Sequence, residues 1–198
     1  MGCAHGALAR AILATNPQCR VTGIDIDPDY VAVAARHCSE TFAADIERMV
    51  DADFARLAPA DCWVFGDCLE HLRDPWSVLR RVRGVIPVGG CVLVCLPNAQ
   101  HWSVQWRLLT GNFRYEDSGL MDRTHIRWFT RITMLEMFEA GGWQVDAGVS
   151  RQVDSPQQQQ VLDAVRAGAL AVGADADQAV ADARPIQYLF RLVPAQGG

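Results

Sequence analysis

The chain contains 5 histidines, and histidine suits the removal of a proton from a hydroxyl because its ordinary pKa lies near about 6.5. His125 is the preferred base. It lies in the segment 111–130, which is predicted to be irregular, and connections longer than about 12–15 residues usually serve as lids or binding loops. Asp122 precedes His125 and is expected to orient its ring or a polar substrate. The alternative is that Asp122 and His125 only pin the loop through hydrogen bonds.

The other histidines are interpreted from their sequence neighbours. His71 lies in the Leu-Glu-His-Leu stretch 69–72 and is the second catalytic candidate, although this Glu-His pair is also typical of a helix cap or of an ordered strand end. His101 is an alternative residue to face the molecule whose hydroxyl reacts. His37 is interpreted as a solvated residue, and His5 as part of a turn that touches a ligand only through its position.

Three carboxylates follow predicted strands: Asp25, Asp45 and Asp67. Ligands of open α/β sheets bind outside the carboxyl ends of the strands, where an acid can accept hydrogen bonds from both hydroxyls of a ribose. Each acid alone is also typical of a solvated loop, but their order along the chain favours a ligand site. Asp27 is better explained as the cap of a helix that begins with Pro28.

Residues 2–6, Gly-Cys-Ala-His-Gly, form a glycine turn at the start of a predicted helix. Small residues let a ligand approach the backbone there, and a helix N-terminus offers free N–H donors. The turn has neither the G-x-G-x-x-G spacing of a dinucleotide site nor the lysine of a phosphate-binding loop. On its own it is equally typical of an ordinary helix start.

Short apolar runs alternate with helical stretches, a pattern that predicts a single domain with a parallel sheet covered on both faces. Helices are predicted at 6–15, 28–37, 75–85, 101–109 and 131–140, followed by an alanine-rich helical region from 155. Strands are predicted at 21–26, 41–46, 62–66, 91–96, 143–149 and 186–193. The alanine-rich region 154–184 is interpreted either as loosely packed helices or as a homodimer contact.

Taken together, these stretches resemble a class I S-adenosylmethionine-dependent methyltransferase over essentially the whole chain. The resemblance is to the branch with a glycine turn, an L-E-H-L-x-D-P stretch, a P-N-x-x-H-W stretch and a D-R-T-H-x-R-x-F-T stretch. The last three are found here at 69–75, 97–102 and 122–130.

The resemblance implies a Rossmann-like three-layer α/β/α sandwich with a mostly parallel sheet and an antiparallel edge. It implies a single domain over 1–198, with a cofactor-binding half at 1–98, an acceptor or lid region at 99–142, and C-terminal strands and helices at 143–198. It also implies S-adenosylmethionine as cofactor and S-adenosylhomocysteine as product. The implied cofactor-binding residues are Gly2, Cys3, Ala4, Gly6, Asp25, Ile26, Asp45, Ile46, Asp67 and Leu69.

The sequence departs from that pattern at two points. Ala4 replaces the middle glycine of the turn, which is tolerable if its backbone stays at negative φ. Family members also carry a strand and an acid immediately before the turn, so we expect an N-terminally shortened reading frame. Without that strand, two inward sheet edges stay unpaired. If this chain is the whole protein, cofactor binding is expected to be weak or absent.

Composition and charge exclude some classes of binding partner and indicate the cellular compartment. The net charge of −5 with dispersed acids argues against nucleic acid. No apolar run approaches the roughly 20 residues of a membrane helix, and the start does not resemble a signal peptide. The 7 cysteines have no zinc spacing, so they are interpreted as buried thiols in a cytoplasmic protein, and no metal is expected.

The predicted reaction is methyl transfer to a small-molecule or glycan acceptor, at oxygen. Aromatic residues of the second half either wall the acceptor pocket or pack the lid on the sheet: Trp102, Trp106, Phe113, Tyr115, Trp128 and Phe129. Two other functions stay open. One is a non-catalytic binding or assembly module with the same sheet, and the other is a nicotinamide-dependent oxidoreductase, which the glycine spacing disfavours.

Overall fold

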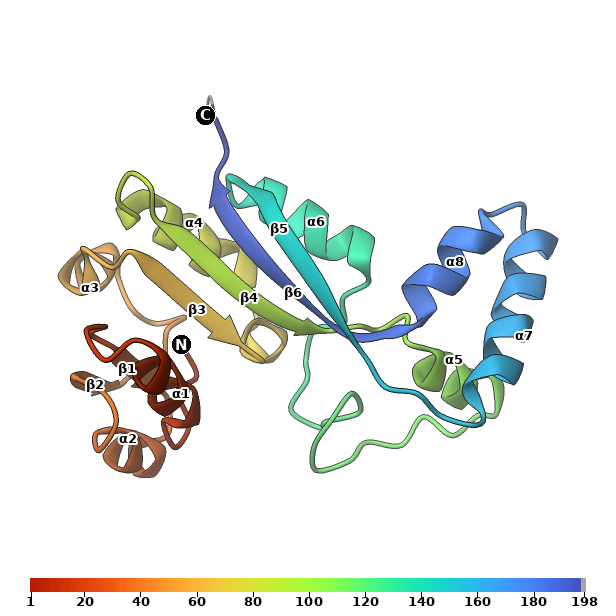
Figure 1. The fold of residues 1–198 in the computed structure, drawn as a ribbon, viewed down its shortest axis with the longest axis horizontal. Coiled ribbons are helices and arrows are strands. Elements are labelled where there is room, and N and C mark those ends of the chain that lie inside the picture. Colours follow the sequence, from red (N-terminus) through yellow and green to blue (C-terminus); the bar gives the residue numbers. More distant parts are fainter. Residues whose placement is uncertain (197–198) are drawn as a thin grey trace.

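The strands form two sheets in the computed structural model, which describes residues 1–196 (Figure 1). In the smaller sheet, β1 (Thr22–Asp25) pairs parallel with β2 (Glu40–Ala43). The larger sheet has the order β3-β4-β6-β5, with the strands β3 (Cys62–Gly66), β4 (Cys91–Pro97), β5 (Trp143–Gln152) and β6 (Pro185–Pro194). β3 and β4 are parallel, whereas β6 is antiparallel to both of its neighbours. The antiparallel edge pair that the family resemblance implied is therefore present, and the sheet is mixed instead of the parallel sheet that the alternating pattern predicted.

The N-terminal residues lie between the two sheets. The amino group of Met1 donates to the carbonyl of Val64 in β3 over 2.8 Å, and the amide of Cys3 donates to the carbonyl of Ile24 in β1 over 3.0 Å. These two bonds connect the glycine turn to β1 on one side and to β3 on the other. That the reading frame is shortened before this turn stays a prediction.

One face of the larger sheet is covered by helices. α4 (Pro75–Val85) and α6 (Arg131–Ala140) lie along it (Figure 1). Trp143 is buried between sheet and helices, and its indole N–H donates to the carbonyl of Leu79 over 3.1 Å. Burying an aromatic side chain while satisfying its one polar group is what makes this core both apolar and specific.

The opposite face of the larger sheet is more open. Leu93, Val149 and Leu189 are each exposed by more than a third, and they line an apolar hollow of about 380 Å³ together with Leu8 of α1 (Ala7–Thr15). Cys91 and Cys95 are also only partly buried, because period-two alternation places them on the same face as Leu93. Cys62 is exposed, so the expected burial of these thiols is correct only for Cys68.

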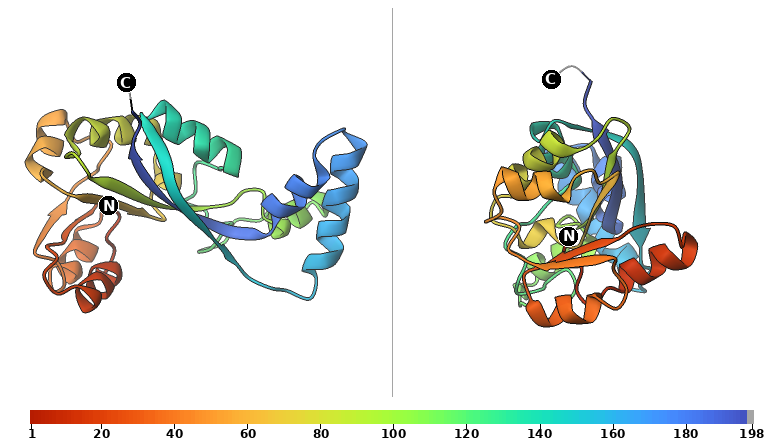
Figure 2. Two further views of the ribbon diagram at one scale, coloured as in Figure 1. Left: turned by 45° about the horizontal axis from the view of Figure 1, so that its top comes forward. Right: turned by 90° about the vertical axis from the view of Figure 1, so that its left-hand side faces the viewer.

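Three helices form a separate group at the far end of the molecule (Figures 1 and 2). They are α5 (Trp102–Leu109), α7 (Gln158–Ala171) and α8 (Ala176–Ala183). Trp102, Val161, Leu162 and Ala183 make a small apolar cluster at their centre. The alanine-rich region therefore has a packed core of its own. No helix within residues 1–196 is long and apolar enough to cross a membrane.

Most predicted elements are present, and the differences are local. α2 (Pro28–Ala34) ends before the predicted His37, and β2 ends at Ala43 instead of Ile46. A further helix, α3 (Asp51–Leu57), was not predicted. It buries one large apolar side chain completely, Phe54, which is too weak a signal for a helical period.

Candidate active site

The glycine turn has a left-handed backbone at three of its residues. Gly2 and Gly6 have φ of 63° and 79°, and Ala4 has φ of 42°. The condition for replacing glycine at Ala4, a negative φ, is therefore not met. Left-handed backbone costs a residue with a Cβ roughly 1–2 kcal/mol, so Ala4 is a strained position within the candidate site.

Asp25 fixes the glycine turn to the carboxyl end of β1. Its Oδ2 accepts a hydrogen bond from the amide of Ala4 over 2.8 Å, and its Oδ1 accepts one from the amide of Asp27 over 3.1 Å. A carboxylate has about four lone-pair positions, so acceptor capacity remains for hydroxyls of a ligand. Asp27 caps α2 by accepting from the amide of Asp29 over 2.8 Å, as predicted.

The candidate adenine residues differ in exposure. Asp45 follows β2, accepts from the amide of Glu47 over 3.0 Å and pairs with Arg48 over 3.3 Å. Ile46 is buried in the main core, whereas the side chain of Ile26 is 69% exposed. Of the two isoleucines, Ile26 offers the free apolar surface.

Asp67 continues the same edge after β3. Its backbone is left-handed, with φ of 49°, and its Oδ1 accepts from the side-chain amide of Gln187 over 2.7 Å. Leu69 is fully buried, so its side chain belongs to the core and not to an open surface. A Cβ placed on Gly2 would lie 3.5 Å from the Cβ of Cys68, which shows how closely the glycine turn approaches the end of β3.

The loop 111–130 is anchored to the short helix η1 (Leu69–His71) that follows β3. The amides of Ile126 and Arg127 both donate to the carbonyl of Glu70 over 3.0 Å. This anchor brings His125 beside His71, with the ring centroids 4.8 Å apart. The structure therefore joins two histidines that are far apart in the sequence. His71 contacts Thr124 of the loop, and the backbone carbonyl of Glu70 holds the same loop.

Glu70 completes a cluster with His71 and His125. Its side chain is fully buried, and neither carboxylate oxygen has a hydrogen-bond partner among the described residues. Burial raises the pKa of Glu70 to about 8. His125 Nε2 lies 3.9 Å from Glu70 Oε1.

The tautomer of each histidine follows from its neighbours. His125 Nδ1 is 3.2 Å from the carbonyl of Leu120, so Nδ1 donates and the lone pair lies on Nε2. His71 Nδ1 is 3.1 Å from both the carbonyl and the Oγ1 of Thr124. That Thr124 hydroxyl donates to Asp122 over 2.6 Å, so His71 Nδ1 must also be the donor, and its Nε2 carries the lone pair.

This geometry corrects the expected role of Asp122. Its carboxylate acts through Thr124 on His71, while the ring of His125 is oriented by the Leu120 carbonyl. Partial burial opposes ionisation of Asp122, but the two hydrogen bonds from Thr124 prevail and lower its pKa. Burial lowers the pKa of His125, which keeps its imidazole neutral.

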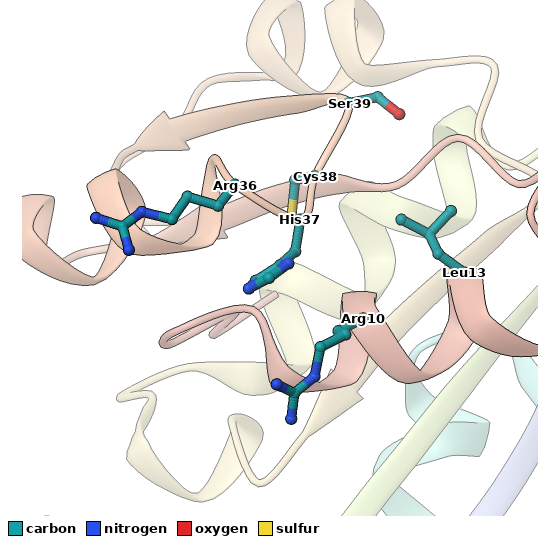
Figure 3. Close-up of a pocket in the computed structure, with 6 residues that line it drawn as sticks. All are labelled: Arg10, Leu13, Arg36, His37, Cys38 and Ser39. Atoms are coloured by element: carbon teal, nitrogen blue, oxygen red, sulfur yellow. The ribbon is translucent and has the colours of Figure 1, made fainter.

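The remaining histidines lie outside this cluster. His101 is buried and caps α5, where it contacts Ser103 Oγ over 2.8 Å, and burial lowers its pKa to about 4. The ring of His5 lies against Tyr30. His37 lines a separate pocket of about 350 Å³ just before β2, away from the carboxyl ends of the strands (Figure 3). Its lining residues are Arg10, Leu13, Arg36, His37, Cys38 and Ser39.

The aromatic residues of the second half lie in different places. Phe129 is buried in the main core, and Trp102 belongs to the helix cluster of α5, α7 and α8. Phe113 and Trp128 lie with centroids 5.6 Å apart, and Trp128 is 6.2 Å from the ring of His125. Trp128 therefore lies beside the cluster, and Phe113 packs against Trp128.

The fold is shared with solved proteins of one kind. The chain has the Rossmann-like fold of S-adenosylmethionine-dependent O-methyltransferases. A mitomycin 7-O-methyltransferase covers 98% of the chain with a TM-score of 0.60 and 15% identity, over 47% of that structure. An O-methyltransferase from neocarzinostatin biosynthesis, solved with S-adenosylmethionine and 2-hydroxy-5-methyl naphthoic acid, gives a TM-score of 0.58 at 14% identity, over 98% of this chain and 47% of that one.

Sequence comparisons agree with this class. Residues 1–92 match the family described as methyltransferase domain. Acetylserotonin O-methyltransferase of Mus musculus is 38% identical over 102 residues, 48% of this chain and 26% of that protein. Ubiquinone biosynthesis O-methyltransferase of Pseudomonas paraeruginosa is 29% identical over 154 residues, 75% of this chain and 62% of that protein. The chain thus spans less than two thirds of either relative.

Proposed function

We propose that the chain binds S-adenosylmethionine and transfers its methyl group to a hydroxyl oxygen of a small molecule. The observation that carries this proposal is the bond from the Ala4 amide to Asp25, which holds a carboxylate at the carboxyl end of β1 beside the open glycine turn. The match of residues 1–92 to a methyltransferase domain and the O-methyltransferase relatives support it.

In this proposal the glycine turn and the strand ends hold the cofactor. Asp25 accepts hydrogen bonds from the ribose hydroxyls, and Asp45 with Ile26 and Ile46 borders the adenine. Gly2, Cys3, Ala4 and Gly6 face the methionine part, together with Asp67 and the backbone of Leu69. The left-handed turn supports this assignment because its small side chains leave the backbone open.

The chemistry requires little beyond alignment and one proton acceptor. The sulfonium carbon–sulfur bond breaks, the acceptor oxygen bonds to the methyl carbon, and S-adenosylhomocysteine leaves as a neutral thioether. The hydroxyl proton passes to His125 Nε2, whose lone pair is fixed by the Nδ1 bond to Leu120. His71 beside it, held through Thr124 and Asp122, is the second acceptor of the cluster.

We propose a small ring-bearing acceptor. Trp128 beside His125, and Phe113 against Trp128, offer flat apolar surfaces, which suit an aromatic ring or the apolar face of a sugar. The neocarzinostatin relative, solved with a hydroxylated naphthoic acid, supports the aromatic member of this pair.

Calorimetry tests the proposal on the 198-residue chain. Met1 and Cys3 bond to β3 and β1 and hold the glycine turn between the two sheets. We therefore expect S-adenosylmethionine and S-adenosylhomocysteine to bind with micromolar affinity, in place of the weak binding expected from a missing strand alone, and NAD not to bind. Addition of 1,4-dihydroxy-2-naphthoic acid with S-adenosylmethionine should then release S-adenosylhomocysteine. No heat with either methyl-donor nucleoside would favour the non-catalytic module, and binding of NAD alone would favour an oxidoreductase. The cyclase of the 4+2 type among the structural neighbours, with a TM-score of 0.59, shows that this fold also serves other chemistry.

A further inference from the structure

We propose that Glu70, His71 and His125 bind a divalent transition-metal ion. One ligand atom from each side chain lies within 4.8 Å of the other two. The three residues come from η1 and from the loop anchored to it, so backbone hydrogen bonds fix their relative positions. The sequence did not point to a metal, because only Glu70 and His71 are adjacent and His125 joins them through an irregular loop.

The buried carboxylate of Glu70 is the first independent observation. Buried polar atoms in folded proteins nearly always have a hydrogen-bond partner, and an unbonded one points to a missing water or ion. Both oxygens of Glu70 lack such a partner among residues 1–196, although the side chain is fully buried. An ion bound between this carboxylate and the two imidazoles would supply the missing partner.

The second observation is the orientation of both histidines. A metal-binding histidine usually donates its other ring N–H to a carbonyl or a hydrogen-bonded oxygen, which fixes the tautomer. His125 donates from Nδ1 to the Leu120 carbonyl, and His71 donates from Nδ1 to Thr124, which is itself held by Asp122. In both cases the lone pair is left on Nε2. The arrangement is that of a supported pair of ligands and not of two surface histidines.

The ligand set selects the class of ion. Ca²⁺ and Mg²⁺ prefer oxygen ligands, whereas two imidazoles with one carboxylate suit Mn²⁺, Fe²⁺, Co²⁺ or Zn²⁺. Ligand bonds of about 2.1 Å place neighbouring ligand atoms about 3 Å apart. His125 Nε2 and Glu70 Oε1 are 3.9 Å apart, and side-chain rotations that move them about 1 Å closer would bring them to this ligand spacing. Three protein ligands leave further positions for water or for an acceptor oxygen.

This inference goes beyond the proposed methyl transfer and does not depend on it. When the ion is bound, His125 serves as a ligand, and the base role described above belongs to the metal-free chain. Binding of the methyl donor, which uses the glycine turn and Asp25, is unaffected by either assignment.

The test is a titration of the 198-residue chain with Mn²⁺, followed through the electron paramagnetic resonance signal of the free ion. Mn²⁺ is chosen because thiolates, present here as free cysteines, bind it poorly compared with Zn²⁺. We expect saturable binding of one ion per chain. Glu70→Gln and His125→Gln should each weaken it at least tenfold, and the partly exposed His71→Gln provides a third variant if a buried substitution perturbs folding.

His37→Gln is the matched control, because His37 lies in the separate pocket before β2 (Figure 3) and should leave Mn²⁺ affinity unchanged. Circular dichroism confirms the fold of each variant. The proposal is overturned if the wild-type chain binds no Mn²⁺ saturably, or if all three cluster variants bind as well as the wild type. S-adenosylhomocysteine affinity, measured on the same samples, distinguishes failure of this site from failure of the methyl-donor site.

Discussion

His125 combines a free Nε2 lone pair with a ring held in place by a backbone carbonyl. In both roles that we propose for it, base or metal ligand, His125 acts on the acceptor and not on the methyl donor. We predict that His125→Ala lowers the release of S-adenosylhomocysteine by roughly 10²–10⁴-fold, the usual contribution of a positioned acid–base group. Affinity for S-adenosylhomocysteine should stay unchanged, and His37→Ala should match the wild type. Undiminished turnover in His125→Ala would exclude a catalytic role for this residue.

His101 is a buried neutral histidine that makes the stability of the fold depend on pH. Burial lowers its pKa to about 4 in the folded chain, whereas the unfolded value is near 6.5. The unfolded state therefore binds more protons between these pH values, and the stability that depends on a neutral His101 is lost as pH falls from 6.5 to 4. The expected loss is about 3 kcal/mol.

The measurement is urea unfolding at pH 7 and pH 4, with His101→Asn as reference. Asparagine keeps a side-chain acceptor at this helix cap but does not titrate in this range. The wild type should lose about 3 kcal/mol more than the variant on acidification. Equal losses in both proteins would show that His101 titrates normally.

Single residues also show how far sequence reasoning reaches. The position of Asp25 at the carboxyl end of β1 could be predicted, because it ends an apolar run about 20 residues after a glycine turn, a spacing with a known physical cause. The hydrogen-bond partners of Asp122 could not be predicted from the sequence. Its bond to Thr124 depends on a local turn within an irregular loop, and no periodicity describes such a turn. Glu70 was visible beside His71, but its complete burial depends on tertiary packing.

At the scale of elements, the glycine turn is the least relaxed segment near the site. Ala4 has φ of 42°, so we predict that Ala4→Gly raises the free energy of unfolding by about 1 kcal/mol, since relief of strain exceeds the entropy cost of glycine. Ala7→Gly is the opposed control. Ala7 is an exposed first residue of α1, and glycine there should lower stability by roughly 0.5–1 kcal/mol.

Thermal unfolding of the two variants checks these signs. Higher stability of Ala4→Gly and lower stability of Ala7→Gly, each relative to the wild type, support a strained turn. Lower stability of both variants would mean that Ala4 is relaxed in solution and that the turn differs from the structure.

Element bounds were predictable where a cap and a breaker enclose the helix. α4 begins after Asp74 with Pro75, and α6 ends at Gly141-Gly142, and both have the predicted bounds. The missed helix α3 begins at Asp51, and the residue before it, Val50, offers no side-chain cap. The loop 111–130 was correctly predicted to be irregular, but its anchor on Glu70 consists of backbone bonds that no side-chain pattern encodes.

At the scale of the whole molecule, the site lies where separate sheets meet. Asp25 ends β1 of the smaller sheet, Asp67 follows β3 of the larger one, and the N-terminal residues bond to both sheets. The family resemblance implied the antiparallel edge pair, but the order of strands was not predicted, because sequence alone does not show that β6 inserts between β4 and β5. The methyl-donor site is thus the feature on which the functional account depends.

The most direct test of that account is the affinity for S-adenosylhomocysteine of the wild type, Asp25→Ala and Asp27→Ala, measured by calorimetry. Asp25→Ala should weaken binding at least tenfold, or about 1.4 kcal/mol, because it removes the acceptor of the ribose hydroxyls. Asp27→Ala removes a carboxylate two residues away that only caps α2, and it should bind like the wild type. Equal affinity in the wild type and Asp25→Ala would contradict the account.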